Sequence, residues 1–209
     1  MARLLESTFV PGPAGPLEAL HEAPDDNVRI ERATVVCHPH PLYGGTIHNK
    51  VVFRLARAAR RAGSAVLRFN FRGVGQSAGS YDEGEGELDD LRAAIAYMND
   101  RYPGLPLAVA GFSFGSRVAL RVCCGDGRIE RVLAAGTPVF RHDWSYLAHC
   151  SCAKHFLHST RDEYGSREQV EAVVAAAAEP KHLEWIEAGD HFFANALDEL
   201  EEAALRAMR

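Results

Sequence analysis

Short apolar runs alternate with longer amphipathic stretches from about residue 33 to the end of the chain. Their length and their content of aliphatic side chains are typical of strands buried on both faces of a parallel sheet. The runs are Ala33–Cys37, Ala65–Phe71, Leu107–Gly111, Val132–Ala135, His155–His158 and His182–Ile186. Repetition of a strand followed by a helix predicts an α/β fold with a mostly parallel central sheet and helices on both of its faces.

The clearest helix lies before the third of these runs. Its apolar residues recur at intervals of three and four, which places them on one helical face. They are Leu88, Leu91, Ile95, Met98 and Tyr102. A second helix follows the first strand, where four arginines at 54, 57, 60 and 61 are expected to form a solvated face.

Two more helices are predicted near the carboxyl terminus. The sequence Ser-Arg-Glu-Gln at 166–169 is a capping-box signature, and it opens an alanine-rich helix that Pro180 is expected to end. The last helix is expected to begin near Asn195. At the amino terminus, Thr8–Val10 and Leu17–Leu20 predict a hairpin with a long turn, because the six residues between them are proline, glycine and alanine.

Composition narrows the class of protein. With 209 residues, 47% hydrophobic and 24% charged, the chain fits a single globular domain over residues 1–209. A net charge of −5 argues against a nucleic-acid surface, and no apolar stretch predicts a signal peptide or a membrane span. Five cysteines without a secretory leader predict reduced thiols and a cytoplasmic location.

The sequence Gly-Phe-Ser-Phe-Gly at 111–115 carries the first candidate chemistry. It follows an apolar run and precedes a helical pattern, so Ser113 is expected on a sharp strand-to-helix turn that exposes its hydroxyl. The flanking glycines are needed because a Cβ atom there would meet the neighbouring strand or helix. A hydroxyl is a weak nucleophile near neutral pH, so a histidine base and an orienting carboxylate are expected elsewhere in the chain.

Candidates for both partners follow later strands. Asp162 comes after the run that ends near His158, and His191 comes after the run that ends near Glu187. Since sites in parallel sheets form at the carboxyl ends of strands, we expect Asp162 and His191 to lie near Ser113. His191 would accept the serine proton, and Asp162 would orient and stabilise the imidazole.

Each assignment has an alternative. Asp162 belongs to a charged triplet at 161–163 that would also suit a solvated surface, and His191 could be an ordinary surface or core histidine. Asp190 is expected to cap its own loop. Gly73-Val74-Gly75 follows a strand, but the next glycine is Gly79, so a dinucleotide fingerprint is not met and turn formation is expected.

Together these motifs resemble the α/β-hydrolase family over nearly the whole chain. Gly111–Gly115 is similar to its nucleophile elbow, and the order of serine, acid and histidine is that of its catalytic triad. The segment Cys-His-Pro-His-Pro-Leu-Tyr-Gly-Gly-Thr at 37–46 sits where the family has its oxyanion loop. Asn-Phe-Arg-Gly-Val-Gly-Gln-Ser at 70–77 resembles the family's Arg-Gly-x-Gly-x-Ser stretch. Among subgroups, the chain resembles small hydrolases related to dienelactone hydrolase.

The resemblance implies an oxyanion hole built from two backbone N–H groups. Phe114 supplies the first. Pro39 and Pro41 have no N–H, so the second donor is His40 or Leu42, and the choice stays open at this point.

The same resemblance bears on the substrate. Members of the family often carry a lid, but residues 137–153 are too few for a helical cap domain, which implies an open or shallow site and small or short-chain acyl groups. The side chains expected to bind substrate are Tyr43, Phe112, Trp144, Tyr146 and Phe192.

The predicted activity is hydrolysis of small carboxylic esters through an acyl-enzyme intermediate, with no cofactor. Acyl transfer, thioester cleavage and peptide cleavage are alternatives with the same triad, and a non-catalytic binding protein of the same fold is another. Metal binding by His38, His40 and His48, or by the Cys/His cluster at 149–158, is not expected. The expected partner is a small-molecule ester, without nucleic acid or membrane, and the chain is a monomer or a homodimer.

Overall fold

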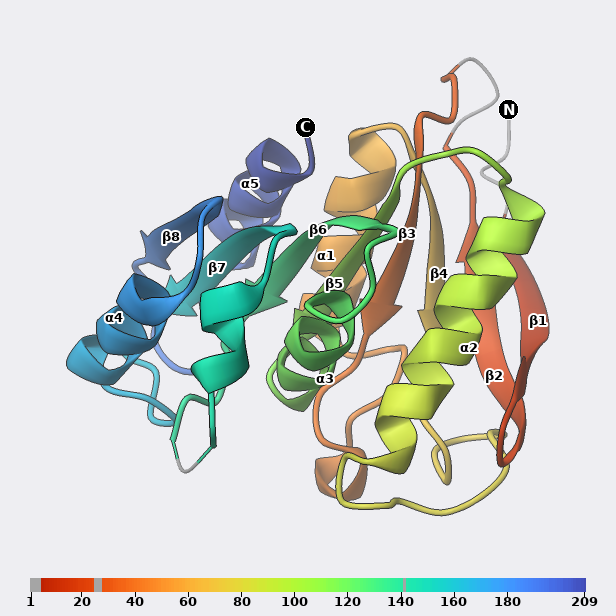
Figure 1. The fold of residues 1–209 in the computed structure, drawn as a ribbon, viewed down its shortest axis with the longest axis horizontal. Helices are drawn as coiled ribbons and strands as arrows, with labels where there is room; N and C mark the ends of the chain where they lie inside the picture. Colours follow the sequence, from red (N-terminus) through yellow and green to blue (C-terminus); the bar gives the residue numbers. More distant parts are fainter. Residues whose placement is uncertain (1–4, 25–27, 141) are drawn as a thin grey trace.

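An eight-stranded sheet forms the middle layer of the computed structural model, which describes residues 5–24, 28–140 and 142–209 (Figure 1). The remaining residues of the predicted domain over 1–209 lie outside the described ranges. The strand order is β1-β2-β4-β3-β5-β6-β7-β8. The strands are β1 (Leu5–Gly12), β2 (Gly15–Glu22), β3 (Arg32–Cys37), β4 (Ser64–Phe69), β5 (Leu107–Phe112), β6 (Ile129–Ala135), β7 (Ala153–Ser159) and β8 (Lys181–Ile186).

The sheet is parallel from β4 to β8 and antiparallel at the edge that β1 and β2 form. The predicted mostly parallel sheet and the predicted amino-terminal hairpin are therefore confirmed. The prediction of a long turn in that hairpin is wrong. The two strands pair as far as Gly12 and Gly15, so only Pro13 and Ala14 connect them. Gly15 has a φ of 115°, which a residue with a Cβ atom rarely adopts, and this allows the tight turn.

Helices cover both faces of this sheet. They are α1 (Lys50–Arg61), α2 (Gly86–Arg101), α3 (Phe114–Cys123), α4 (Arg167–Ala176) and α5 (Leu197–Met208). Helices α1 and α5 bury their apolar residues in one core cluster, and α2, α3 and α4 bury theirs in a second cluster on the opposite face (Figure 1). Two 3₁₀ turns, Pro41–Tyr43 and Ser145–His149, complete the described elements, and no cap domain lies between β6 and β7.

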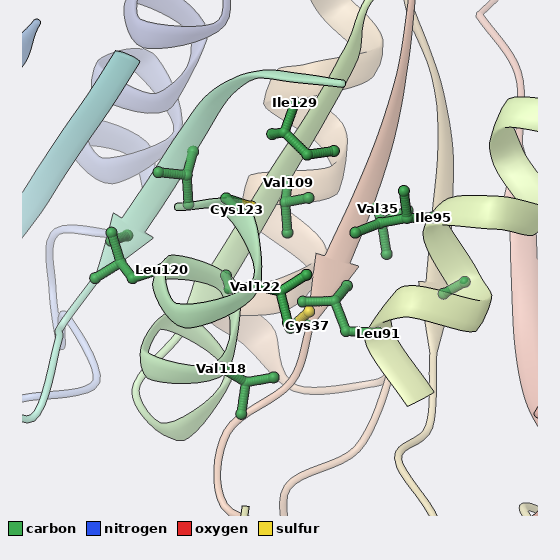
Figure 2. Packing of buried hydrophobic residues seen from close by; sticks show 14 of the residues in the cluster. Val35, Cys37, Leu91, Ile95, Val109, Val118, Leu120, Val122, Cys123 and Ile129 are labelled. Atoms are coloured by element: carbon green, nitrogen blue, oxygen red, sulfur yellow. The ribbon is translucent and has the colours of Figure 1, made fainter. Parts of the chain in front are cut away.

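The core beneath α2 and α3 is built from the predicted helical face and the apolar strands. Leu91 and Ile95 of α2 belong to the same buried cluster as Val35 and Val109 of the central strands (Figure 2). Tyr102 follows the end of α2 and is half-buried. Its hydroxyl oxygen lies 2.7 Å from Nε2 of His21. Across the described residues, no helix has the length and apolar character that crossing a membrane requires.

Helix α4 begins as predicted and ends earlier than predicted. Both hydrogen bonds of the capping box between Ser166 and Gln169 are present. The helix ends at Ala176, before it reaches Pro180, and Ala177 is extended, with φ −69° and ψ 146°. The expectation that Pro180 ends the helix is therefore wrong.

Two cysteines correct the expectation of five reduced thiols. Cys124, at the end of α3, forms a disulfide with Cys150, at the end of the second 3₁₀ turn. The two residues are 26 positions apart in sequence, so neither spacing nor periodicity shows that they meet. Cys37, Cys123 and Cys152 are free and buried.

The arginines of α1 are not a purely solvated face. Arg54, Arg57 and Arg61 all contact the carboxylate of Glu201 on α5, at 2.9, 3.3 and 2.9 Å respectively. The side chain of Glu201 is only 3% exposed. The buried carboxylate thus joins α1 to α5, and the guanidinium groups balance its charge.

Loss of that charge should weaken the contact between α1 and α5. Glu201→Gln leaves three guanidinium groups around a neutral amide, so we expect the free energy of unfolding to fall by about 2 kcal/mol in urea denaturation. The neighbouring Glu202→Gln is the control, because Glu202 is 53% exposed and its single ion pair is worth about 0.5 kcal/mol. Equal losses in the two variants would contradict this account of Glu201.

Candidate active site

Ser113 sits on a sharp turn between β5 and α3, in a strained backbone conformation with φ 53° and ψ −121°. The glycines on either side permit close packing that no larger residue allows. A Cβ atom on Gly111 would lie 2.3 Å from the carbonyl oxygen of Gly115, and one on Gly115 would lie 2.5 Å from that of His38. The turn therefore requires both glycines, as the sequence pattern predicts.

Asp162 and His191 meet at the same edge of the sheet. Nδ1 of His191 lies 2.9 Å from each carboxylate oxygen of Asp162, and the two side chains are 2% and 3% exposed. Since a carboxylate only accepts, Nδ1 carries the proton and Nε2 is left as the free nitrogen. Nε2 is buried and has no hydrogen-bond partner in the described part of the chain.

His191 and Ser113 line the same cavity, which has a volume of about 530 Å³. Asp162 lies behind His191. The cavity is also lined by His40, Tyr43, Phe114 and Phe192. A histidine and a serine thus line one space that is large enough for a small organic molecule.

Several residues that the motifs do not reveal hold His191 in place. Glu163 accepts the backbone N–H of His191 at 3.0 Å, and the ring of Tyr164 lies 4.5 Å from the imidazole. Gly136, after β6, leaves room for the ring, since a Cβ atom there would lie 3.1 Å from Cε1 of His191.

The alternative interpretation of residues 161–163 as a solvated charge cluster is wrong for Asp162, because its side chain is buried.

The loop after His191 is organised by its neighbour Asp190. The carboxylate of Asp190 accepts the backbone N–H groups of Phe192 and Ala194, at 2.9 and 3.0 Å. The predicted capping role of Asp190 is therefore confirmed.

His38 has a structural role at the exit of β3. Its Nδ1 lies 2.6 Å from the carbonyl oxygen of Pro39, and its Nε2 accepts the backbone N–H of Phe71 at 3.0 Å. These contacts require a neutral ring with the proton on Nδ1. Burial lowers the pKa of His38 from 6.5 to about 4, which keeps the ring neutral.

His40 faces the cavity and organises the turn beside it. Its Nδ1 accepts the backbone N–H of Leu42 at 3.2 Å, and its Nε2 lies 3.3 Å from the hydroxyl of Tyr81. Burial, and then the charge of Arg117, lower the pKa of His40. Leu42 is 66% exposed and its N–H group is already bound.

The expected substrate-binding side chains divide into two groups. Tyr43 and Phe192 line the cavity that contains Ser113. Phe112 is fully buried, with its ring 5.0 Å from the imidazole of His191. Trp144 is buried and donates its indole N–H to the carbonyl oxygen of Val139, and Tyr146 lines a neighbouring cavity. The structure thus does not bring Phe112, Trp144 or Tyr146 to this cavity wall.

The cysteines and histidines of the stretch 149–158 lie in different surroundings. His155 faces His182 across neighbouring strands, whereas His158 lies beside Asp162, with Nδ1 3.9 Å from its carboxylate. Within the described ranges, the one group with metal-ligand spacing is that of Cys124, Cys150 and Cys152, whose sulfurs lie within 4.8 Å of one another. Two of these sulfurs form the disulfide.

A parallel sheet between helices, a serine on a strand-to-helix turn and no cap domain define an α/β hydrolase without a lid. The chain belongs to the alpha/beta hydrolase family, because the family model described as "Alpha/beta hydrolase domain" matches residues 39–204. A closer link to dienelactone hydrolase stays a prediction.

Three other proteins are similar to this chain over most of its length. An uncharacterized protein of Rickettsia prowazekii is 34% identical over 202 residues, which is 92% of this chain and 84% of that protein. The structure of a Xanthomonas campestris protein described as an α/β serine hydrolase without lid is 34% identical, with a TM-score of 0.91 over 98% of this chain and 94% of that one. An α/β serine hydrolase homologue from Coxiella burnetii is 34% identical, with a TM-score of 0.92 over 98% and 97%.

Buried neutral histidines near the site predict a loss of stability in acid. Burial lowers the pKa of His158, like that of His38, from 6.5 to about 4. Below pH 6.5 the unfolded chain binds protons that the folded chain does not, so the free energy of unfolding falls as the pH drops toward 4. In His158→Leu, the fall between pH 7.5 and pH 5 should be smaller by about 2 kcal/mol in urea denaturation. The control is His48→Leu, at an exposed position, and the same change in both variants would contradict the prediction.

Proposed function

We propose that this protein is a serine hydrolase that cleaves small or short-chain carboxylic esters through an acyl-enzyme intermediate. The observation that carries the proposal is that His191 lines the same cavity as Ser113, with its Nδ1 bound to Asp162 and its Nε2 without a hydrogen-bond partner among the described residues. A base, its orienting carboxylate and a hydroxyl are the groups that this chemistry needs.

The first step transfers the acyl group to the protein. Oγ of Ser113 attacks the carbonyl carbon while Nε2 of His191 takes the hydroxyl proton, and Asp162 stabilises the imidazolium. Collapse of the tetrahedral intermediate breaks the ester bond, and Nε2 returns the proton to the leaving alcohol. Water then repeats the sequence in place of the serine, which releases the acid and restores Ser113.

Two backbone N–H groups would stabilise the oxyanion. Phe114 is the first residue of α3, where an N–H group has no partner within the helix. Leu42 already donates its N–H to His40, so the second donor in this proposal is the N–H of His40, which lines the cavity. Each such donor is worth about 3 kcal/mol of transition-state stabilisation.

The same triad would serve acyl transfer, thioester cleavage or peptide cleavage, and these stay alternatives. A non-catalytic protein of this fold would be expected to have a blocked pocket or a displaced His191. The cavity of about 530 Å³ between His191 and Ser113 favours catalysis over that alternative.

Replacement of Ser113 tests the nucleophile. We expect the parent protein to hydrolyse 4-nitrophenyl acetate and butyrate, and Ser113→Ala to lower kcat/KM by about 1,000-fold or more, because the variant lacks the hydroxyl that forms the acyl-enzyme. A fluorophosphonate probe should label the parent and not the variant. Ser145→Ala, at an exposed serine, is the control. Turnover that is absent in the parent, or equal in parent and Ser113→Ala, would overturn the proposal.

Acyl-chain length tests the open site. Without a cap there is no apolar cover for a long chain, so kcat/KM should stop rising by butyrate across a 4-nitrophenyl series from acetate to decanoate. Burial of each further methylene would instead contribute about 0.8 kcal/mol, a rise of about fourfold per carbon. A continued rise of that size would contradict the short-chain preference.

A further inference from the structure

Arg117 lines the same cavity as Ser113, from a position one helical turn further along α3. Its guanidinium carbon lies 5.1 Å from the centre of the Phe114 ring. On its other side it packs against Gly84, where a Cβ atom would lie 2.4 Å from one guanidinium nitrogen. The aromatic ring and the glycine together hold the side chain in place, although neither is an anion.

The charge of Arg117 is not balanced by an ion pair. Among the described residues, no carboxylate lies within 4 Å of its guanidinium. Arg121, one turn further along the same helix, pairs with Glu85 at 2.7 Å. The buried carboxylate of Glu87 accepts backbone N–H groups of Asp82 and Gly84 instead.

The positive charge of Arg117 acts on another residue of the cavity wall. His142 lines the cavity too, and its pKa is lowered first by burial and then by the charge of Arg117. Glu83 is the carboxylate that lines this cavity, without forming an ion pair with Arg117. A guanidinium beside this cavity and without an ion-pair partner among the described residues favours an anionic ligand there.

A second cavity, of about 580 Å³, continues from Arg117 away from Ser113. Arg117 and His142 line both cavities, and the second is also lined by Arg121 and His149. Asp143 is the carboxylate on its wall, and its oxygens bind the N–H and hydroxyl of Ser145. The wall of the second cavity thus carries two guanidinium groups and one carboxylate.

We infer that Arg117 is an anion-binding subsite, and that the natural ester carries a carboxylate or phosphate group which Arg117 binds while its carbonyl carbon lies at Ser113. This rests on the proposed hydrolysis and narrows its substrate class. The planar guanidinium binds such groups through two parallel hydrogen bonds, which would fix the distance between the anion and the reacting carbon. The anion belongs to the acid part or to the alcohol part of the ester, and the two cases need separate substrates.

Two matched pairs of esters test the subsite. For the acid part, mono-4-nitrophenyl adipate is compared with 4-nitrophenyl hexanoate. For the alcohol part, 4-acetoxybenzoate is compared with its methyl ester. We expect the anionic member of at least one pair to have the higher kcat/KM, and Arg117→Gln to reduce that ratio by about tenfold. Arg117→Lys keeps the charge without the planar fork, so it should retain part of the preference.

Arg121→Gln is the matched control, because it removes the same charge one turn further from Ser113. It should change the ratio by less than about twofold. A parent protein with no preference in either pair, or an Arg117→Gln variant with the parent's ratio, would overturn the inference. So would an equal effect of Arg121→Gln, since the preference would then reflect net charge alone.

A binding measurement separates this inference from the proposed function. In the Ser113→Ala background, calorimetry with 4-acetamidobenzoate and adipate measures anion binding without turnover. If the parent cleaves no ester but binding is lost on adding Arg117→Gln, then hydrolysis fails and the subsite stands. If neither anion binds in a manner that depends on Arg117 and no ester preference is seen, then the subsite is wrong whatever the activity.

Discussion

The close approach of α3 to the end of β3 is the constraint on which the rest of the site depends. Gly115 packs so tightly against the carbonyl groups of Cys37 and His38 that no Cβ atom fits between them. In the same turn Ser113 has a strained conformation, which costs on the order of 1–3 kcal/mol and persists because buried strands surround it. The contact of Gly115 also places the free N–H end of α3 beside the loop that begins at His38.

That loop is in turn held by the segment after β4. His38 accepts the backbone N–H of Phe71, and Asn70 accepts that of Ile47 at 2.9 Å. Arg72 binds the fully buried carboxylate of Asp90 on α2 through its side chain and its backbone. The motif at 70–77 therefore acts as a scaffold, because polar contacts fix the loop beside Ser113 to the sheet and to α2.

The sequence predicted those parts of the fold that local pattern determines. Strands buried on both faces are continuous apolar runs, and a serine between two glycines indicates its own backbone turn. Contacts between distant segments carry no such local pattern. Cys124 pairs with Cys150, and the α1 arginines pair with Glu201, because the folded elements that carry them lie close together in space. Trp144 was expected to bind substrate, but its side chain is buried and its indole N–H donates to the carbonyl oxygen of Val139.

The arginines have different surroundings in different parts of the molecule. Three guanidinium groups on α1 share one buried carboxylate, and their charge is used in joining two helices. Arg117 is held by an aromatic ring and by packing, which position a cation without neutralising it. A carboxylate partner there would stabilise the folded chain further, but it would occupy the hydrogen bonds that an anionic ligand needs. An unbalanced, well-held charge beside Ser113 thus gives up some stability and leaves its hydrogen-bond donors open to a ligand.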